Sequence, residues 1–248
     1  MTVPTAEVAP SNVPEAPSAA APRQDRRVAL LLSVLLVALV AVALGLSSGT
    51  VGATPRKVAV VGDSITNQSS YALTEELGRH GYGAAVNGIN GAGIAQMTPA
   101  LVSAVSPGGG ADVVVAALGT NNAFFAAMDD QRHEDLDRSV ADLDVAVRQI
   151  TDGPDDHAYA PSARCVVWVN VNDHTPVLDL PTNGARLNAA IADRLEAERA
   201  KGRDVVLVDF ASASRDQPGW FLPDGIHLTP TGQQAYARLI RQGVDRCR

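Results

Sequence analysis

The chain has little cysteine, few aromatic residues and no excess of basic charge. Only two of its 248 residues are cysteine, and no Cys-x-x-Cys pair or Cys/His cluster suggests a metal site. Aromatic residues make up 4% of the chain, a value that says little about pocket preference. Four of the 20 basic and three of the 27 acidic residues lie in residues 1–56, which leaves residues 57–248 with a net charge of −8. A basic nucleic-acid footprint is therefore absent, and we expect no nucleic-acid partner.

The N-terminal part has a composition of its own. Residues 1–22 are rich in Pro, Ala, Ser and Val and cannot bury a core, so we expect them to be disordered. Residues 28–46 form an uncharged apolar run, and about 20 helical residues suffice to cross a bilayer. Two interpretations stay open. The run exceeds the usual core of a secretory signal, which favours an uncleaved anchor, but the small residues at 51–53 resemble a cleavage site.

The chain is therefore predicted to have four segments. Three arginines before the apolar run favour a cytoplasmic N-terminus, although two basic residues just beyond the run weaken that bias. In either interpretation the C-terminal part lies outside the cytoplasmic membrane, on a single-pass anchor or secreted after cleavage. The segments are a disordered cytoplasmic stretch (1–27), a transmembrane anchor or signal (28–46), a linker (47–56) and a folded domain (57–248).

The folded domain shows valine-rich apolar runs that alternate with helical patterns. The runs are continuous rather than alternating, as expected for strands covered on both faces. Strand–helix alternation indicates parallel pairing through right-handed crossovers, so we expect a three-layer α/β domain with about five strands. The predicted strands are 57–61, 84–87, 112–118, 165–171 and 205–209. The predicted helices lie near 67–80, 94–105, 132–150, 184–201 and 230–243.

Short polar motifs follow these strands. Gly-Asp-Ser follows the first strand, Asn-Gly-Ile-Asn-Gly-Ala-Gly the second and Gly-Thr-Asn-Asn the third. The fifth strand leads to an Asp and a His three residues apart. In open parallel sheets ligands bind beyond the carboxyl ends of the strands, so these four loops are predicted to converge on one edge.

Ser64 of the Gly-Asp-Ser motif is a candidate nucleophile, because a serine can attack an acyl group once a base takes its proton. The same position also suits a helix N-cap or a phosphate-binding loop. His227 is the candidate base, with Asp224 placed to fix its tautomer. The spacing alone is weak evidence, since Asp130 and His133 repeat it in a charged segment that we interpret as a solvated helix face.

Acyl transfer also needs hydrogen-bond donors for the developing oxyanion. Gly91 can offer a backbone N–H at close range, Asn121 a side-chain amide, and Ser64 its own N–H at the start of a helix. Each of these residues also has an ordinary reading as part of a turn or cap. Their order and placement together favour a site.

Taken together, these motifs resemble those of a known family. Gly-Asp-Ser, a glycine in the second loop, Gly-x-Asn and a C-terminal Asp-x-x-His look like the four blocks of the SGNH/GDSL hydrolase superfamily. The most specific part is the segment WFLPDGIHLTPTGQQAYA, and the match runs from Val58 to about Ile240. The chain is also similar to SGNH domains fused to membrane acyltransferases that modify cell-surface glycans. In this resemblance the four namesake residues are Ser64, Gly91, Asn121 and His227, and Asp224 completes the triad.

The resemblance implies a flavodoxin-like sheet and an esterase or O-acyltransferase that needs neither metal nor organic cofactor. Its substrate would be a small acyl ester or an acylated glycan, and a membrane acyltransferase is a candidate companion. Many family members have Asp after Gly-x-Asn, whereas this chain has Asn122, which puts a loop-stabilising contact in question. Two alternatives remain: an anchored domain that binds a glycan or protein without turnover, and phosphate or nucleotide binding at the first loop, for which neither a Walker A nor a dinucleotide fingerprint is present.

Three further features carry two readings each. Cys165 begins a predicted strand and Cys247 follows the last helix, so they either form a disulfide that ties down the C-terminus or lie too far apart. Four aromatic residues flank the site loops and either line a pocket or pack into the core: Phe124, Phe125, Trp220 and Phe221. Four others could be drawn as a metal cluster, although a solvated face is favoured: Asp129, Asp130, His133 and Glu134.

Overall fold

The structure is a computed structural model that describes residues 55–248 except 109, 127–134, 154–159, 162 and 178. The predicted cytoplasmic segment and the apolar run at 28–46 lie outside the described residues, and so does the acidic cluster around His133. Within the described part, none of the helices has the length and apolarity needed to cross a bilayer.

Five parallel strands form one sheet in the order β2-β1-β3-β4-β5. This is the flavodoxin-like order. Strand β2 is added on one side of β1 and the later strands on the other, so the strand order reverses between β1 and β3. Strand β1 pairs with a neighbour on each side, since Val60 is opposite Val86 of β2 and Val115 of β3. The strands are β1 (Arg56–Gly62), β2 (Tyr82–Gly88), β3 (Val113–Ala117), β4 (Cys165–Val169) and β5 (Val205–Val208).

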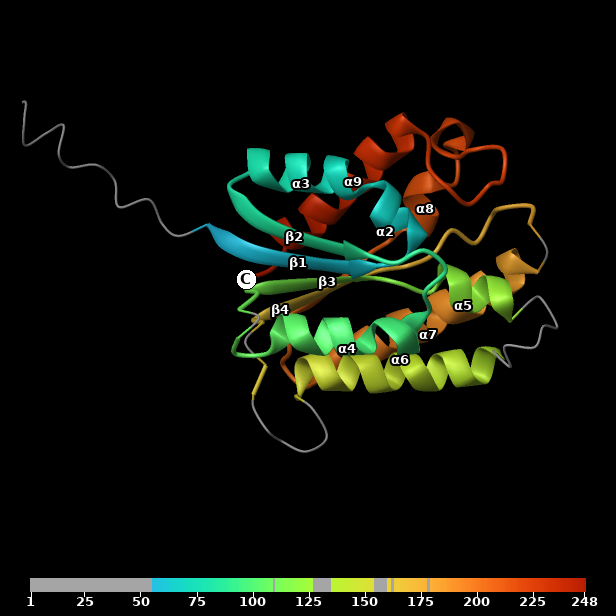
Figure 1. Cartoon of the computed structure of the whole chain (residues 1–248). Helices are drawn as coiled ribbons and strands as arrows, with labels where there is room; N and C mark the ends of the chain where they lie inside the picture. The colour runs from blue at the N-terminus through green and yellow to red at the C-terminus, as the bar shows by residue number, and fades with distance from the viewer. Residues whose placement is uncertain (1–54, 109, 127–134, 154–159, 162, 178) are drawn as a thin grey trace, which may run out of the picture. The chain divides into compact units, whose positions relative to one another are not determined.

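Helices cover both faces of the sheet and make three layers (Figure 1). One face carries α3, α8 and α9, whose apolar residues pack with Val58, Val60 and their neighbours. The other face carries α4, α6 and α7, packed around Trp168 of β4. The helices are α2 (Ser64–Gln68), α3 (Ser70–Arg79), α4 (Ile94–Val105), α5 (Thr120–Phe125), α6 (Leu136–Thr151), α7 (Leu180–Ala200), α8 (Phe210–Ser214), the 3₁₀ helix η1 (Pro218–Trp220) and α9 (Pro230–Asp245).

The predicted α/β architecture with a five-stranded parallel sheet is confirmed, and the differences concern short elements. Every residue of β3 and β4 is buried, which explains why these strands read as continuous apolar runs. The helix predicted at 67–80 is two helices that meet at Ser69. Strand β1 already begins at Arg56, inside the predicted linker. Helices α5 and α8 and the 3₁₀ helix were not predicted, because three to six residues are too few to show a helical period.

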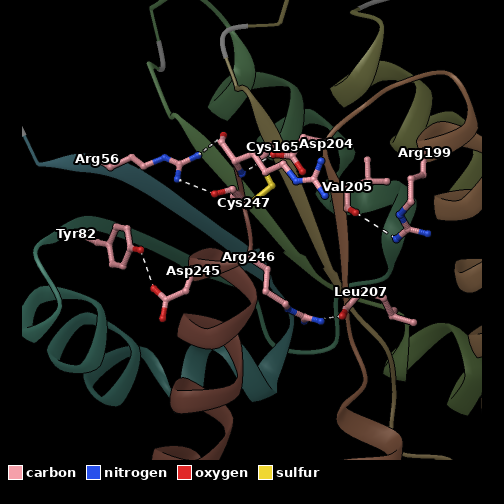
Figure 2. The surroundings of a disulfide bond; sticks show 11 residues. Arg56, Tyr82, Cys165, Arg199, Asp204, Val205, Leu207, Asp245, Arg246 and Cys247 are labelled. Atoms are coloured by element: carbon pink, nitrogen blue, oxygen red, sulfur yellow. Dashed lines mark hydrogen bonds between the residues drawn. A yellow bond between two sulfur atoms is a disulfide. The ribbon is translucent and has the colours of Figure 1, made fainter.

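A disulfide joins the sheet to the C-terminal helix. Cys165 at the start of β4 is bonded to Cys247, just beyond the end of α9, and their Cα atoms are 5.8 Å apart (Figure 2). That separation lies inside the usual range for a disulfide. Of the two alternatives that the sequence left open, the structure shows the disulfide.

Two arginines cover the exposed edge of β5. The Arg199 guanidinium donates to the carbonyl oxygen of Val205 at 3.2 Å, and that of Arg246 donates to Leu207 at 2.7 Å (Figure 2). β5 is the last strand of the sheet, so these carbonyls have no strand partner. Because unpaired edge groups are templates for strand addition, the two guanidinium groups protect this edge.

Candidate active site

Ser64 lies where β1 ends and α2 begins. Gly62 lets the chain pass tightly here, since a Cβ on it would come within 2.0 Å of Thr66 Oγ1 and 2.7 Å of the Ala117 carbonyl. Asp63 is the N-cap of α2, and its Oδ1 accepts from the Ile65 N–H at 3.0 Å. Ser64 is therefore the first residue of the helix, where a backbone N–H has no intrahelical partner.

The loop before α9 brings a histidine and a carboxylate to this serine. His227 Nε2 is 3.0 Å from Ser64 Oγ, and His227 Nδ1 is 2.8 Å from Asp224 Oδ2. With the Nδ1 proton held by the carboxylate, Nε2 is left to accept the hydroxyl proton of Ser64. The structure thus brings the three predicted side chains together in a hydrogen-bonded row, from Ser64 through His227 to Asp224.

Backbone hydrogen bonds hold Asp224 as an anion. Burial by itself would raise the pKa of the Asp224 carboxyl, but the backbone N–H of Ile226, the His227 ring and the His227 N–H outweigh it and hold the pKa below its usual value. The carboxylate is thus charged at neutral pH and can accept the hydrogen bond of the His227 ring.

The loop that carries Asp224 and His227 is anchored at both ends. The Leu222 N–H donates to the carbonyl of His227 at 2.7 Å and closes the loop. Gln68, at the end of α2, accepts from the Leu228 N–H at 2.9 Å and ties the loop to the helix that carries Ser64. Thr229 then caps α9 by accepting from the Gly232 N–H. Gln68 was not singled out in the sequence, where nothing distinguishes it from other polar residues on a helix.

The three predicted oxyanion donors, from Ser64, Gly91 and Asn121, line one cavity. Gly91 adopts φ +73°, a region that favours glycine, and nothing lies within 4 Å of where its side chain would be. The N–H groups of Ser64 and Gly91 donate to none of the described residues. The Asn121 amide donates one hydrogen to the Ala92 carbonyl at 3.0 Å, which orients the group and leaves its second hydrogen available.

The neighbouring glycines and Asn122 have structural roles. Gly88 ends β2, where a Cβ would come within 2.3 Å of the Asn67 nitrogen, and Gly93 is the N-cap of α4. Asn122, which replaces the usual Asp, accepts from the Ile94 N–H at 3.0 Å and donates to Ser139 Oγ at 3.2 Å. The loop contact that was in question is therefore made by the amide.

The candidate site residues line an open cavity of about 470 Å³. Its lining includes Ser64, Gly91, Asn121 and His227 together with three residues that the sequence did not reveal: Asn67, Gln68 and Asn90. Asn67 donates to Asn90 at 2.9 Å and so links α2 to the loop after β2. A second cavity of about 690 Å³ shares Asn90 and Gly91 and extends toward Ile89, Met97 and Phe125. Substrate groups therefore have room beside the serine.

Asp63, next to the serine, is a buried acid. Asp63 is 1% exposed, and its Oδ2 has no hydrogen-bond partner among the described residues. Burial raises the pKa of Asp63 to about 7, although the Ile65 N–H and the nearby His227 lower it in part. The pKa of buried Tyr236 is raised by its own burial and by Asp63. An acid with a pKa raised to about 7 is thus next in sequence to Ser64, the candidate nucleophile.

The other histidines and the aromatic residues considered in the sequence do not line the cavity at Ser64. His80 caps the C-terminus of α3, and His174 lies in the loop after β4 with its ring nitrogens buried. Phe125 lines the larger cavity, while Phe124 packs against the core and Trp220 packs on the opposite face. Across the described part of the chain, no three His, Cys, Asp or Glu side chains gather to hold a metal ion.

Comparison with solved structures shows the same fold at low sequence identity. The catalytic domain of a peptidoglycan O-acetyltransferase from Streptococcus pneumoniae is 14% identical, with a TM-score of 0.57 over 78% of this chain and 94% of that one. An acetylxylan esterase from Geobacillus stearothermophilus is 15% identical, with a TM-score of 0.56 over 78% and 96%. A family 3 carbohydrate esterase from Clostridium thermocellum is 17% identical, with a TM-score of 0.58 over 77% and 96%. A search of curated proteins gives no match.

A match between the sequence and a family model identifies the family. Residues 60–235, well over half of the chain, match the model of the GDSL-like lipase/acylhydrolase family. That stretch includes the strand end that carries Ser64 and the loop that carries His227. With the predicted resemblance confirmed, the chain belongs to the GDSL-like lipase/acylhydrolase family, the SGNH hydrolases.

Proposed function

We propose that this protein is an extracytoplasmic serine esterase that hydrolyses or transfers acyl groups. The observation that carries the proposal is the relay from Ser64 Oγ through the His227 ring to Asp224, with successive distances of 3.0 and 2.8 Å. Membership of an acylhydrolase family supports the same chemistry. A domain that only binds has no need for a base aligned with a serine.

In the first half of the reaction Ser64 Oγ attacks the ester carbonyl while His227 Nε2 takes its proton. Asp224 stabilises the imidazolium that forms. Negative charge develops on the carbonyl oxygen and is met by the N–H groups of Ser64 and Gly91 and by the Asn121 amide. The imidazolium then protonates the alcohol as it leaves, and an acyl group remains on Ser64.

In the second half His227 activates water, which attacks the acyl group and regenerates Ser64. The cavity is open, so an acceptor hydroxyl in place of water would convert hydrolysis into transfer. The two outcomes use the same residues. The mechanism asks for no metal and no organic cofactor.

We propose O-acetyl groups of cell-surface glycans as the substrate class, with short-chain lipid esters as the alternative. Three similar folds support the first: one solved neighbour is a peptidoglycan O-acetyltransferase, one an acetylxylan esterase and one a carbohydrate esterase. The apolar run at 28–46 supports a cell-membrane location with the catalytic domain outside, or secretion if the run is cleaved. A membrane acyltransferase is a fitting companion for such a domain.

Active-site labelling tests the proposal. The full chain is treated with a fluorophosphonate probe and digested, and the modified residue is identified by mass spectrometry. We expect the label on Ser64, and none on Ser64→Ala or on heat-denatured wild type. A folded wild type that hydrolyses no short-chain nitrophenyl ester and takes no label would instead fit the non-catalytic glycan- or protein-binding domain.

A further inference from the structure

The wall of the cavity at Ser64 consists of polar, uncharged groups and one histidine. Besides Ser64, Gly91 and His227, its lining consists of four residues with amide side chains: Asn67, Gln68, Asn90 and Asn121. In the part of the chain that the structure describes, no apolar side chain, carboxylate, lysine or arginine belongs to this lining. An alkyl chain therefore finds no apolar surface there, and an ion finds no permanent charge of opposite sign. The wall favours a neutral ligand that makes hydrogen bonds.

Three of these amides are held by one hydrogen bond and leave their other end available. Gln68 Oε1 accepts from the Leu228 N–H at 2.9 Å, and its Nε2 donates to none of the described residues. Asn67 Nδ2 donates to Asn90 Oδ1 at 2.9 Å, which leaves Asn67 Oδ1 and Asn90 Nδ2 without a partner in the described chain. Asn67 and Asn90 are exposed and Gln68 is half-buried, so a ligand in the cavity can reach these groups. The amides therefore present donors and an acceptor that the protein has already oriented.

The path of the catalytic proton decides which part of an ester lies against these amides. His227 Nε2 passes its proton to the leaving alcohol, so the alcohol must lie on the His227 side of the reacting carbonyl. Asn67 and Gln68 line the same cavity as His227. The larger cavity of about 690 Å³ shares Gly91 but does not include His227, and the exposed side chain of Ile89 belongs to its lining. The alcohol therefore lies against Asn67 and Gln68, and the acyl group points toward the larger cavity.

We propose that Asn67 and Gln68 recognise the alcohol part of the substrate, and that this alcohol is a polyol such as a sugar ring. The inference rests on the proposed function and chooses between its two substrate classes, glycan esters and short-chain lipid esters. A sugar hydroxyl both donates and accepts, so it can pair with Asn67 Oδ1 or Gln68 Nε2, whereas an alkyl alcohol leaves both groups unpaired. In acyl transfer the same surface binds the acceptor, because His227 takes the proton of the incoming hydroxyl from this side.

The test compares two acetyl esters on the full chain whose alcohols have rings of equal size. Monoacetylated methyl xyloside carries free hydroxyl groups, and cyclohexyl acetate carries none. The selectivity is the ratio of kcat/KM for the xyloside ester to kcat/KM for cyclohexyl acetate. Each ester has the same intrinsic reactivity with every variant, and a structural defect lowers both rates together. A change in the ratio therefore reports recognition of the alcohol.

Asn67→Leu replaces the amide by an apolar side chain of similar size. We expect the selectivity to fall by about fivefold or more, because the xyloside ester loses a hydrogen bond and cyclohexyl acetate does not. Asn67→Gln keeps an amide and should recover part of the selectivity. Gln242→Leu, which removes an exposed amide near the end of α9, is the matched control and should leave the ratio at the wild-type value. A wild-type ratio in Asn67→Leu would overturn the assignment of this residue.

Gln68→Met separates recognition from support of the loop that carries Asp224 and His227. Loss of the bond to the Leu228 N–H should lower Tm and reduce kcat/KM on both esters. Loss of the Nε2 donor should reduce kcat/KM for the xyloside ester further, so that the selectivity again falls by about fivefold or more. Equal losses on the two esters would show that Gln68 only supports the loop, and the role in recognition would be rejected.

The failure of polyol recognition is distinguishable from the failure of the esterase. Wild type that hydrolyses p-nitrophenyl acetate but not the xyloside ester remains an esterase and has no polyol site. The same holds if the xyloside ester is cleaved and neither Asn67→Leu nor Gln68→Met changes the selectivity. Wild type that hydrolyses none of the three esters would reject the esterase itself, and recognition of a leaving alcohol would be rejected with it.

Discussion

His227 Nε2 lies 3.0 Å from Ser64 Oγ, although 163 residues separate the two in the sequence. β1 delivers the serine to the carboxyl edge of the sheet, and the loop before α9 returns the histidine to the same edge. This position is the switch point between β1 and β3, where open α/β sheets bind their ligands. The contact joins the beginning and the end of the described chain.

Removal of either partner should abolish turnover. For Ser64→Ala and His227→Ala we expect kcat/KM on p-nitrophenyl acetate to fall by about 10³-fold or more. The double variant should be little worse than either single one, because the two groups act as a unit. Ser103→Ala and His80→Ala are the matched controls and should retain full activity. Additive losses in the double variant would mean that the residues act separately.

Asp224→Asn tests the orientation of the histidine. The amide removes the negative charge and offers an N–H where the His227 Nδ1 proton needs an acceptor, so kcat should fall by about 10²- to 10⁴-fold. The lowered pKa of Asp224 predicts that its carboxylate stays charged, and keeps its hydrogen bond to the His227 ring, until the pH falls below the ordinary pKa of an aspartate. Asp216→Asn, on the exposed segment after α8, is the control. An active Asp224→Asn enzyme would contradict the relay.

Asn121 and Asn122 are neighbours with different expected effects. Asn121→Ala removes an oxyanion donor and should lower kcat by about 10²-fold or more with little change in KM. Asn122→Ala breaks the bonds to Ile94 and Ser139 and should mainly lower Tm. Steady-state kinetics and thermal unfolding on both variants separate the roles. If Asn122→Ala lowered kcat and Asn121→Ala lowered only Tm, the side-chain oxyanion donor would be Asn122.

Asp63 should make stability depend on pH. Its pKa is about 7 in the folded protein against an ordinary value of 3.8, so between those values the folded state keeps a proton that the unfolded state has lost. Stability then falls as pH rises through this window, with a slope approaching about 1.4 kcal/mol per pH unit from this group. Asp63→Asn keeps the N-cap and should remove that slope. Parallel stability curves for the two proteins, from urea unfolding between pH 4 and about pH 7, would contradict the assignment.

The Cys165–Cys247 bond spans 82 residues of sequence and should stabilise the domain. Reduction with dithiothreitol is expected to lower the free energy of unfolding by about 2–4 kcal/mol. The double variant Cys165→Ala/Cys247→Ala should resemble the reduced wild type and should not respond to the reductant. A reductant effect of equal size on both proteins would mean that the bond is not its source.

Much of this arrangement could be predicted from the sequence. Buried parallel strands are valine-rich, which made β1, β3, β4 and β5 recognisable, whereas β2 has a single valine and no buried residue. Ligand loops of such sheets share one edge. That rule was enough to bring Ser64, Gly91, Asn121 and His227 together. Because each motif lies in a loop that follows a strand, the sheet determines where that motif is placed.

The rest depends on packing that has no local signal. Gln68 holds Leu228 only because α2 points its last side chain at a loop 160 residues away. Asp63 looks like any N-cap until the fold buries it, and the burial decides its pKa. His174 reads as a polar loop residue, yet the segments after β4 and β5 enclose its ring nitrogens.

The two arginines that cover the edge of β5 also affect how copies of the domain meet at high concentration. A second molecule that extended the sheet at this edge would first have to displace the guanidinium groups of Arg199 and Arg246 from the carbonyls of Val205 and Leu207. Copies of the domain at high concentration can therefore remain separate molecules instead of polymerising through this edge.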